Sequence, residues 1–274
     1  MTDLFESDSK VPKDEISQTN TPLAEKLRPK SLNEVVGQDR ILAADGQLTL
    51  MVKSSQLVSI IFWGPPGVGK TTIARAIANE VSAHYEEISA IFSGVSDLKK
   101  LLNAASVRYS NGARTILFVD EIHRFNKSQQ DSFLPYMENG SIILMGATTE
   151  NPSFELNSAL LSRSQVLILE RLNAEDLLKI FNRAIGSMKN APMFSENAIS
   201  FIIEMSDGDG RSLLNYIEQV ASWNSNNTVT EQDLKTRLSR RVTNYDKKGD
   251  HHYNLISALH KSCLLYTSDA ADEP

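Results

Sequence analysis

The chain has 274 residues and a formal net charge of −6, with 41% apolar and 23% charged residues. This length allows one large domain or two modest ones with a substantial buried core. The negative balance gives no sign of nucleic-acid binding but does not exclude it, because binding needs only a local basic surface. No apolar run reaches about 18 residues, so the sequence predicts no membrane span.

The two ends of the chain carry their own signals. Residues 1–21 are polar, lack the features of a signal peptide, and predict a disordered arm. The single cysteine, Cys263, cannot form an internal disulfide, which fits a reducing cytoplasm. Residues 263–274 abandon the preceding helical pattern and resemble the in-frame translation of a sequencing-library adapter. We therefore expect a non-native tail there and a natural chain that continues past Ser262.

Between residues 22 and 170, short apolar runs alternate with helical patterns. The runs that predict strands cover residues 57–64, 84–89, 114–121, 140–150 and 165–170. The patterns that predict helices cover residues 71–82, 95–112 and 127–138. Alternation of this kind predicts an α/β domain with a largely parallel sheet and helices on both faces.

The strand patterns stop after Arg171. Asn173, Ser195 and Thr230 each precede an acidic first turn, so we expect them to be helix N-caps. The four predicted helices cover residues 173–188, 195–209, 210–224 and 230–241. The sequence thus predicts a small all-α domain over residues 171–241, followed by a linker and the start of another region at 242–262.

A glycine-rich loop follows the first apolar strand. It matches the pattern G-x-x-x-x-G-K-[ST], with a strand before it and a helix after it. Glycines let consecutive backbone N–H groups face a phosphate, and the helix adds its positive end. Lys70 would bind the β- and γ-phosphates, and the Thr71 hydroxyl would ligate Mg²⁺. The loop as a whole predicts a nucleotide site made of Gly64, Pro65, Pro66, Gly67, Val68, Gly69, Lys70, Thr71 and Thr72.

Two adjacent carboxylates end another apolar strand, in the stretch "ILFVDE". Like charges side by side near a core are costly unless a cation or a reaction uses them. In a parallel sheet the carboxyl ends of all strands lie at the same end of the sheet, so we expect this pair near the phosphate loop. We predict that Asp120 faces the Mg²⁺ and that Glu121 activates the attacking water.

The motifs together resemble one family. "FWGPPGVGKTTIARAIA", "FVDEIHRFNKSQQDSFLPYMENGSIILMGATTENPSFELNSALLSR" and "GDGRSLLN" are similar to the AAA+ ATPases of the replication-associated recombination type, bacterial relatives of the Werner-helicase-interacting ATPase. The resemblance covers about residues 22–262. It implies a P-loop AAA+ ATPase domain at 22–170 and a helical lid at 171–241.

The resemblance also implies roles for single residues. Thr149 would be the sensor-1 residue, with Asn151 as the competing candidate, and Arg211 would be sensor 2. Arg163 would be the arginine finger that reaches a neighbouring subunit's nucleotide; a solvated surface arginine is the alternative. His123 would transmit nucleotide state or be structural. The adenine pocket would be lined by Arg28, Pro29, Val36 and Gln38.

Three further features are a possible helix cap, a basic cluster and a histidine pair. Asn126 would cap a helix or contact a partner. A basic cluster at 235–241, with Lys247 and Lys248, would bind phosphates or be a solvated helix end. The pair His251 and His252 has no partners at metal-ligand spacing.

The motifs predict an ATP- and Mg²⁺-dependent hydrolase, and the resemblance implies that DNA stimulates it and that it acts at stalled or damaged replication forks. The expected substrates are forked, gapped or other single/double-strand junctions, and the expected location is the bacterial cytoplasm and nucleoid. The resemblance implies a homo-tetramer built by a region past Ser262, which this chain would lack, and a single-strand-binding protein as a partner. The alternatives are a clamp-loader or branch-migration motor subunit, and a nucleotide-gated adaptor that recruits repair partners.

Overall fold

The computed structural model describes residues 21–54, 56–223 and 227–245, with side chains as far as Leu238. The chain forms two compact units. Unit 1 contains the residues up to Ala191 together with those from Ile203 to Asn224. Unit 2 contains Pro192–Ile202 and the residues from Ser225 onward. The predicted boundaries of the ATPase and lid domains, at residues 170 and 241, stay a prediction.

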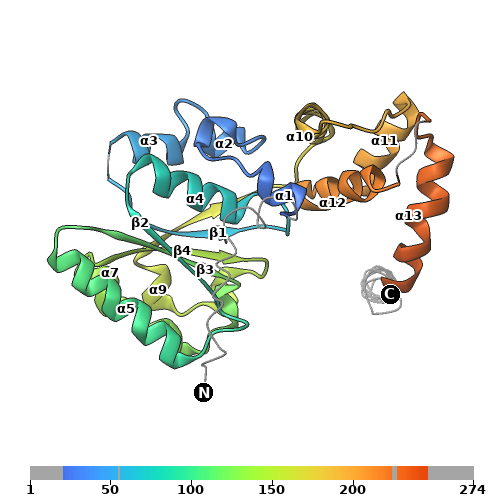
Figure 1. The fold of residues 1–274 in the computed structure, drawn as a ribbon. Coiled ribbons are helices and arrows are strands. Elements are labelled where there is room, and N and C mark those ends of the chain that lie inside the picture. The colour runs from blue at the N-terminus through green and yellow to red at the C-terminus, as the bar shows by residue number, and fades with distance from the viewer. Residues whose placement is uncertain (1–20, 55, 224–226, 246–274) are drawn as a thin grey trace, which may run out of the picture. The chain divides into compact units, whose positions relative to one another are not determined.

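Unit 1 is built on a parallel five-stranded sheet with the order β2-β3-β4-β1-β5 (Figure 1). The buried runs consist mostly of β-branched, aromatic and leucine side chains, which suit a sheet covered on both faces. The α/β prediction with a parallel sheet is confirmed. The strands are β1 (Ser59–Trp63), β2 (His84–Ser89), β3 (Thr115–Asp120), β4 (Ile142–Thr148) and β5 (Ser164–Ile168).

Helices cover both faces of this sheet, as Figure 1 shows. On one face, Ile73 and Ile77 of α4 pack with Phe62 of β1 in one apolar cluster. On the other face, Leu98 and Leu102 of α5 belong to a second cluster. The helices of this part are α1 (Leu23–Lys26), η1 (Leu32–Glu34), α2 (Asp39–Leu42), α3 (Gln47–Lys53), α4 (Lys70–Glu80), α5 (Val95–Ser110), η2 (Ile122–Arg124), α6 (Lys127–Asp131), α7 (Leu134–Glu138), α8 (Pro152–Glu155) and α9 (Ser158–Leu161).

The helix predicted over residues 127–138 is two short helices instead. Asn126 caps α6 by accepting from the backbone N–H of Gln129, so the cap interpretation is confirmed. The chain then leaves the helix and begins α7 with Pro135 in its first turn. Proline lacks an N–H, so Pro135 cannot donate to the carbonyl of Asp131, and this breaks the helical hydrogen-bond pattern between α6 and α7.

The remaining helices follow β5. They are α10 (Ala174–Ser187), α11 (Glu196–Met205), α12 (Gly210–Ala221) and α13 (Glu231–Tyr245). The expected N-caps are confirmed: Asn173 accepts from Asp176 N–H, Ser195 from Ala198 N–H and Thr230 from Asp233 N–H. In unit 2 a single parallel bridge joins Phe194 to Val229, a strand-like contact that the helical patterns did not predict.

The edge strand β2 is tied to α5 by one carboxylate. Glu86 accepts from His84 and from Arg108, at 3.0 Å and 2.5 Å. The hydrogen bond from His84 and the charge of Arg108 hold the pKa of Glu86 below its ordinary value of 4.5, although partial burial opposes them. A carboxylate with a lowered pKa stabilises the fold above its unfolded-state pKa, and this stabilisation is lost as the pH falls through the lower folded-state value.

We expect Glu86→Gln to lower the free energy of unfolding at pH 7 by roughly 0.5–1 kcal/mol, since the pair is only partly buried. The difference from the parent chain should vanish well below pH 4.5, where the carboxylate is protonated in both states. Urea unfolding at both pH values measures this. Glu204→Gln is the control, because no described residue forms an ion pair with this exposed carboxylate. An equal loss at acid pH would contradict the prediction.

Candidate functional site

The loop between β1 and α4 bends through two glycines with positive φ. Gly67 has φ of +70° and Gly69 has φ of +102°, a region that favours glycine. A Cβ on Gly67 would also lie 1.7 Å from Oδ1 of Asp209. The carbonyl of Gly67 accepts from the backbone N–H of Gly210, at 3.2 Å. The loop is therefore in direct contact with the start of α12.

Helix α4 begins at Lys70 and has no side-chain cap, so its first N–H groups are available to an anion. Lys70 is buried, and its Nζ donates to the carbonyls of Gly64 and Pro65, at 2.7 Å and 2.8 Å. Burial lowers the pKa of Lys70, and the positive charge of Arg211 acts in the same direction. Glu121 and Asp120 oppose this effect from a distance.

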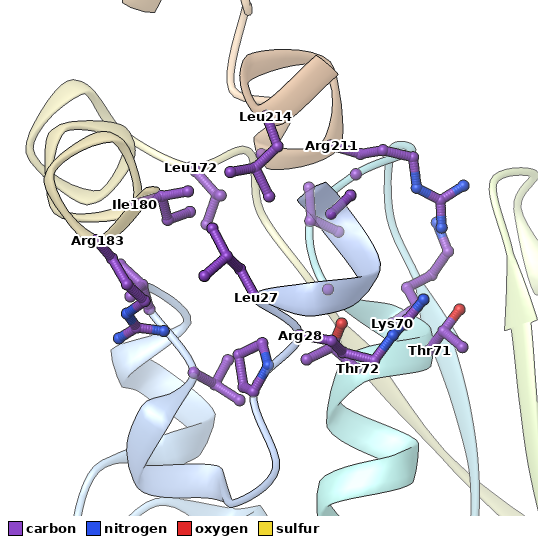
Figure 2. A pocket seen from close by; sticks show the side chains of 18 residues that line it. Leu27, Arg28, Lys70, Thr71, Thr72, Leu172, Ile180, Arg183, Arg211 and Leu214 are labelled. Carbon is purple, nitrogen blue, oxygen red and sulfur yellow. The ribbon is translucent and has the colours of Figure 1, made fainter. Parts of the chain in front are cut away.

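Figure 2 shows Arg211, from α12, and Lys70, from α4, with their cationic ends in the same region of one pocket. The pocket lies within unit 1 and holds about 830 Å³, part of it open to solvent. Its opposite side is apolar and includes Leu27, Leu172, Ile180 and Leu214. A ligand with an anionic end and a flat apolar end would match both sides.

Most of the predicted nucleotide-binding residues line this pocket. Those present are Arg28, Pro29, Val36, Gly67, Val68, Gly69, Lys70, Thr71, Thr72 and Arg211. Gly64 does not line it; a Cβ there would lie 2.3 Å from the Leu169 carbonyl, so close packing requires glycine. Pro65 and Pro66 face a separate small hollow beside Asp209.

Gln38 also lies outside the pocket lining. Its side-chain amide donates to the carbonyl of Glu170 and accepts from the N–H of the same residue, at 2.7 Å and 3.1 Å. This two-way contact fastens the start of α2 to the segment after β5. Gln38 thus positions a wall of the pocket from outside it.

The predicted carboxylates end β3, and β4 separates β3 from β1 in the sheet. Asp120 is the last residue of the strand, and Glu121 has φ of +51°, which turns the chain sharply there. Thr149 Oγ1 donates to Glu121 Oε2 at 3.5 Å, and Thr149 is exposed. Asn151, the competing sensor candidate, caps α8 through the N–H of Ser153. The geometry favours Thr149 as the partner of Glu121.

Arg163 lies where the strands begin, at the end of the sheet opposite the phosphate loop. It precedes Ser164, which pairs with Ser59 at the amino ends of β5 and β1. Its Nη2 lies 2.7 Å from Oε1 of Glu138, and its side chain is 41% exposed. The structure therefore does not bring Arg163 to the pocket beside Lys70 of its own chain.

Sequence reasoning missed the apolar and basic wall of the pocket. Leu27, Leu172, Ile180, Arg183 and Leu214 line it from four separate segments. The helical spacing of Ile180 and Leu214 predicts an apolar face but does not show that the face borders a cavity.

The predicted basic cluster is only partly described. Lys235 pairs with Glu231 at 2.5 Å and lies over the ring of Phe201, with Nζ 5.3 Å from its centroid. Helix α13 continues to Tyr245, so residues 235–241 lie within the helix and not at its end. Lys247, Lys248, His251 and His252 are outside the described residues.

Comparison with known proteins shows which protein families this sequence resembles. The family profile "ATPase family associated with various cellular activities" matches residues 60–172, and the profile "AAA C-terminal domain" matches residues 188–263. "Replication-associated recombination protein A" of Escherichia coli K12 is 44% identical over 263 residues, which is 92% of this chain and 59% of that protein. The chain therefore carries an AAA ATPase domain and is similar to this group of proteins over 92% of its length. It spans about 59% of the length of such relatives.

Other relatives support the family. "ATPase WRNIP1" of Dictyostelium discoideum is 40% identical over 88% of this chain and 30% of that protein. Among solved structures, a mutant of Thermotoga maritima RuvB is 28% identical, with a TM-score of 0.65, over 77% of this chain and 72% of that one. The "RuvB Holliday junction branch migration motor" of the same organism has 30% identity and a TM-score of 0.60, over 72% and 65%. The P-loop AAA+ fold is confirmed.

No helix in the described part of the chain combines the length and apolar character that crossing a membrane requires. Within the same residues, no group of three or more His, Cys, Asp or Glu side chains gathers to hold a metal ion.

The close contact at Gly67 gives a testable consequence. We expect Gly67→Ala to lower the free energy of unfolding by roughly 1–3 kcal/mol, because alanine is strained at this φ and must displace Asp209. Denaturant unfolding measures the change. Gly186→Ala in α10 is the matched control, since nothing lies within 4 Å of its added Cβ. It should be neutral or stabilise by up to about 1 kcal/mol. Equal stabilities of the two variants would contradict the prediction.

Proposed function

We propose that this chain is the ATP-hydrolysing part of a protein that acts on DNA in replication-associated recombination or repair. The observation that carries the proposal is the convergence of two cations, Lys70 and Arg211, beside an uncapped helix start in one pocket. Burying Lys70 among carbonyls is unfavourable unless an anion offsets its charge. A nucleoside triphosphate supplies that anion.

The cationic side and the apolar side of the pocket would each bind one end of such a ligand. The N–H groups of the glycine loop and the first turn of α4 would bind the phosphates, with Lys70 moving from its carbonyl partners toward them. The base would lie against Pro29, Val36 and Ile180. Arg28 is held by Glu25 at the rim, at 2.5 Å.

Two residues offer suitable ligands for Mg²⁺, which supplies charge neutralisation to the phosphates when bound. The Thr71 hydroxyl borders the pocket, and the Asp120 carboxylate ends β3 close enough to raise the pKa of Lys70 electrostatically. Hydroxyl and carboxylate oxygens are the hard donors that this ion prefers. The donor chemistry therefore fits, with water completing the coordination.

The carboxylate of Glu121 would orient and deprotonate the attacking water, and Thr149 would hold that carboxylate or contact the γ-phosphate. Arg163 would complete the nucleotide site of a neighbouring chain, because it lies at the amino ends of the strands and not beside the pocket of its own chain. Arg211 would register the loss of the γ-phosphate and change the position of the helices that carry it.

Action on forked or gapped DNA at stalled forks is the finer part of the proposal. The support is the name of the relatives that are 42–44% identical to this chain. The RuvB structures, whose sequences are 26–30% identical to this chain, support a branch-migration motor as the second candidate function. Tetramer formation, contact with a single-strand-binding protein, and a location in the cytoplasm near the nucleoid belong to the same proposal.

Two substitutions separate nucleotide binding from hydrolysis. We expect Lys70→Ala to weaken ATP binding by at least about 100-fold, because it removes a charge-assisted contact from a buried site. Glu121→Gln should keep ATP affinity and lower kcat by roughly 100-fold or more, because it removes the general base. Equilibrium dialysis and phosphate release measure the two effects. Lys189→Ala, which changes an exposed lysine, is the control.

Normal hydrolysis by Glu121→Gln would show that another group activates the water. Undiminished ATP binding by Lys70→Ala would show that the pocket does not hold a triphosphate.

Stimulation by DNA tests the finer proposal. We expect the ATPase rate to rise several-fold with forked or gapped DNA and less with blunt duplex of the same length. The rise should fall steeply with salt, as for a contact with phosphates. A preference for four-way junctions over forks would favour the branch-migration alternative. No response to any DNA, with ATP turnover intact, would favour a nucleotide-gated adaptor.

A further inference from the structure

A buried histidine lies directly behind the carboxylate assigned as the base. His123 is in η2, two residues after Glu121, and its side chain is 4% exposed. His123 lies between the ends of β3 and β4, the two strands that lead into the proposed catalytic groups.

Three side chains surround the imidazole ring. Nδ1 lies 2.9 Å from Thr148 Oγ1 and 3.3 Å from Glu121 Oε2. Nε2 lies 3.3 Å from Glu150 Oε1. Nε2 is fully buried and makes no well-aligned hydrogen bond among the described residues, so Glu150 is its nearest partner.

The two side chains beside Nδ1 differ in the hydrogen bonds they can form with it. The hydroxyl of Thr148 donates to the carbonyl of Glu150 at 3.2 Å and accepts from the N–H of Glu150 at 3.1 Å. Its one hydrogen is therefore used. A carboxylate oxygen can only accept, so Nδ1 serves Glu121 when it carries the ring hydrogen, and Thr148 Oγ1 can then accept from it as well.

We propose that His123 is a positioning residue for Glu121, whose carboxylate it holds from Nδ1. The inference rests on the proposed role of Glu121 as the base. Thr149 contacts the same oxygen of Glu121 at the longer distance of 3.5 Å and is exposed, so it restrains the carboxylate less than the buried ring. Misplacement of a catalytic group by about 1 Å can cost roughly 100-fold in rate.

Substitutions that imitate one ring nitrogen at a time test this inference. The amide of His123→Asn can replace Nδ1 and keep the contacts with Thr148 and Glu121. His123→Gln places its amide nearer the position of Nε2, and His123→Phe removes both nitrogens. We expect kcat to stay within about 3-fold for Asn and to fall by about 10- to 100-fold for Gln and Phe, with KM and ATP affinity unchanged.

The control is His84→Gln, a change to an exposed histidine that does not line the pocket, which should leave turnover unchanged. A double variant adds a sharper measurement. In the Glu121→Gln background, His123→Phe should cause no further loss of kcat, because the carboxylate it positions is gone.

Several outcomes would overturn the inference. Equal losses for Asn, Gln and Phe, with lower thermal stability, would mark His123 as structural only. A further loss in the Glu121→Gln background would show that His123 acts independently of Glu121. Should His123→Phe fail to fold, the contrast between Asn and Gln still decides. Normal turnover by Glu121→Gln would refute the proposed base, which is a separate failure from normal turnover by His123→Gln.

Discussion

The proposed nucleotide pocket of this molecule depends on one buried cation, the ammonium group of Lys70. Lys70 lies at the first turn of α4, and in the described part of the chain it forms no ion pair with a carboxylate. Two loop carbonyls satisfy its hydrogen bonds but do not neutralise its charge. The surrounding loop, the helix start and Arg211 add further positive potential. Glu121, Asp120 and Asp209 offset this positive potential only in part, so an anionic ligand in contact with Lys70 would stabilise its charge further.

The same loop also connects to the helices after β5. Gly67 receives the N–H of Gly210 and approaches Asp209 too closely for any side chain of its own. Asp209 in turn caps α12 through the N–H of Ser212, and α12 carries Arg211. A change in the loop on phosphate binding would thus reach α12 through hydrogen bonds and direct packing, without a flexible connection between them.

Much of this arrangement was predictable from sequence because it depends on local patterns. Buried strands read as apolar runs, and the spacing of Gly64, Gly69 and Lys70 marks the loop independently of the rest of the fold. Asn126 and Asn173 predict the helix starts, because an asparagine side chain there accepts a hydrogen bond from the backbone N–H three residues later.

The rest depends on contacts between distant segments. Nothing near Gln38 in sequence shows that it pairs with Glu170, 132 residues away. The contacts of His123 with Thr148, Glu121 and Glu150 become apparent only when the fold places the end of β4 beside the end of β3. The wall formed by Leu27 and Ile180 likewise requires knowing which apolar faces border a cavity rather than a packed core.

The location of Arg163 constrains how copies of this chain could associate. Lys70 lies where the strands end, and Arg163 lies where they begin. If Arg163 serves another copy, then the donating surface and the receiving surface are different, and each copy has one of both. Such contacts join head to tail and give a ring or a spiral, whereas a two-fold pair would bring identical surfaces together. One member at an open end of that series would always keep an unassisted site.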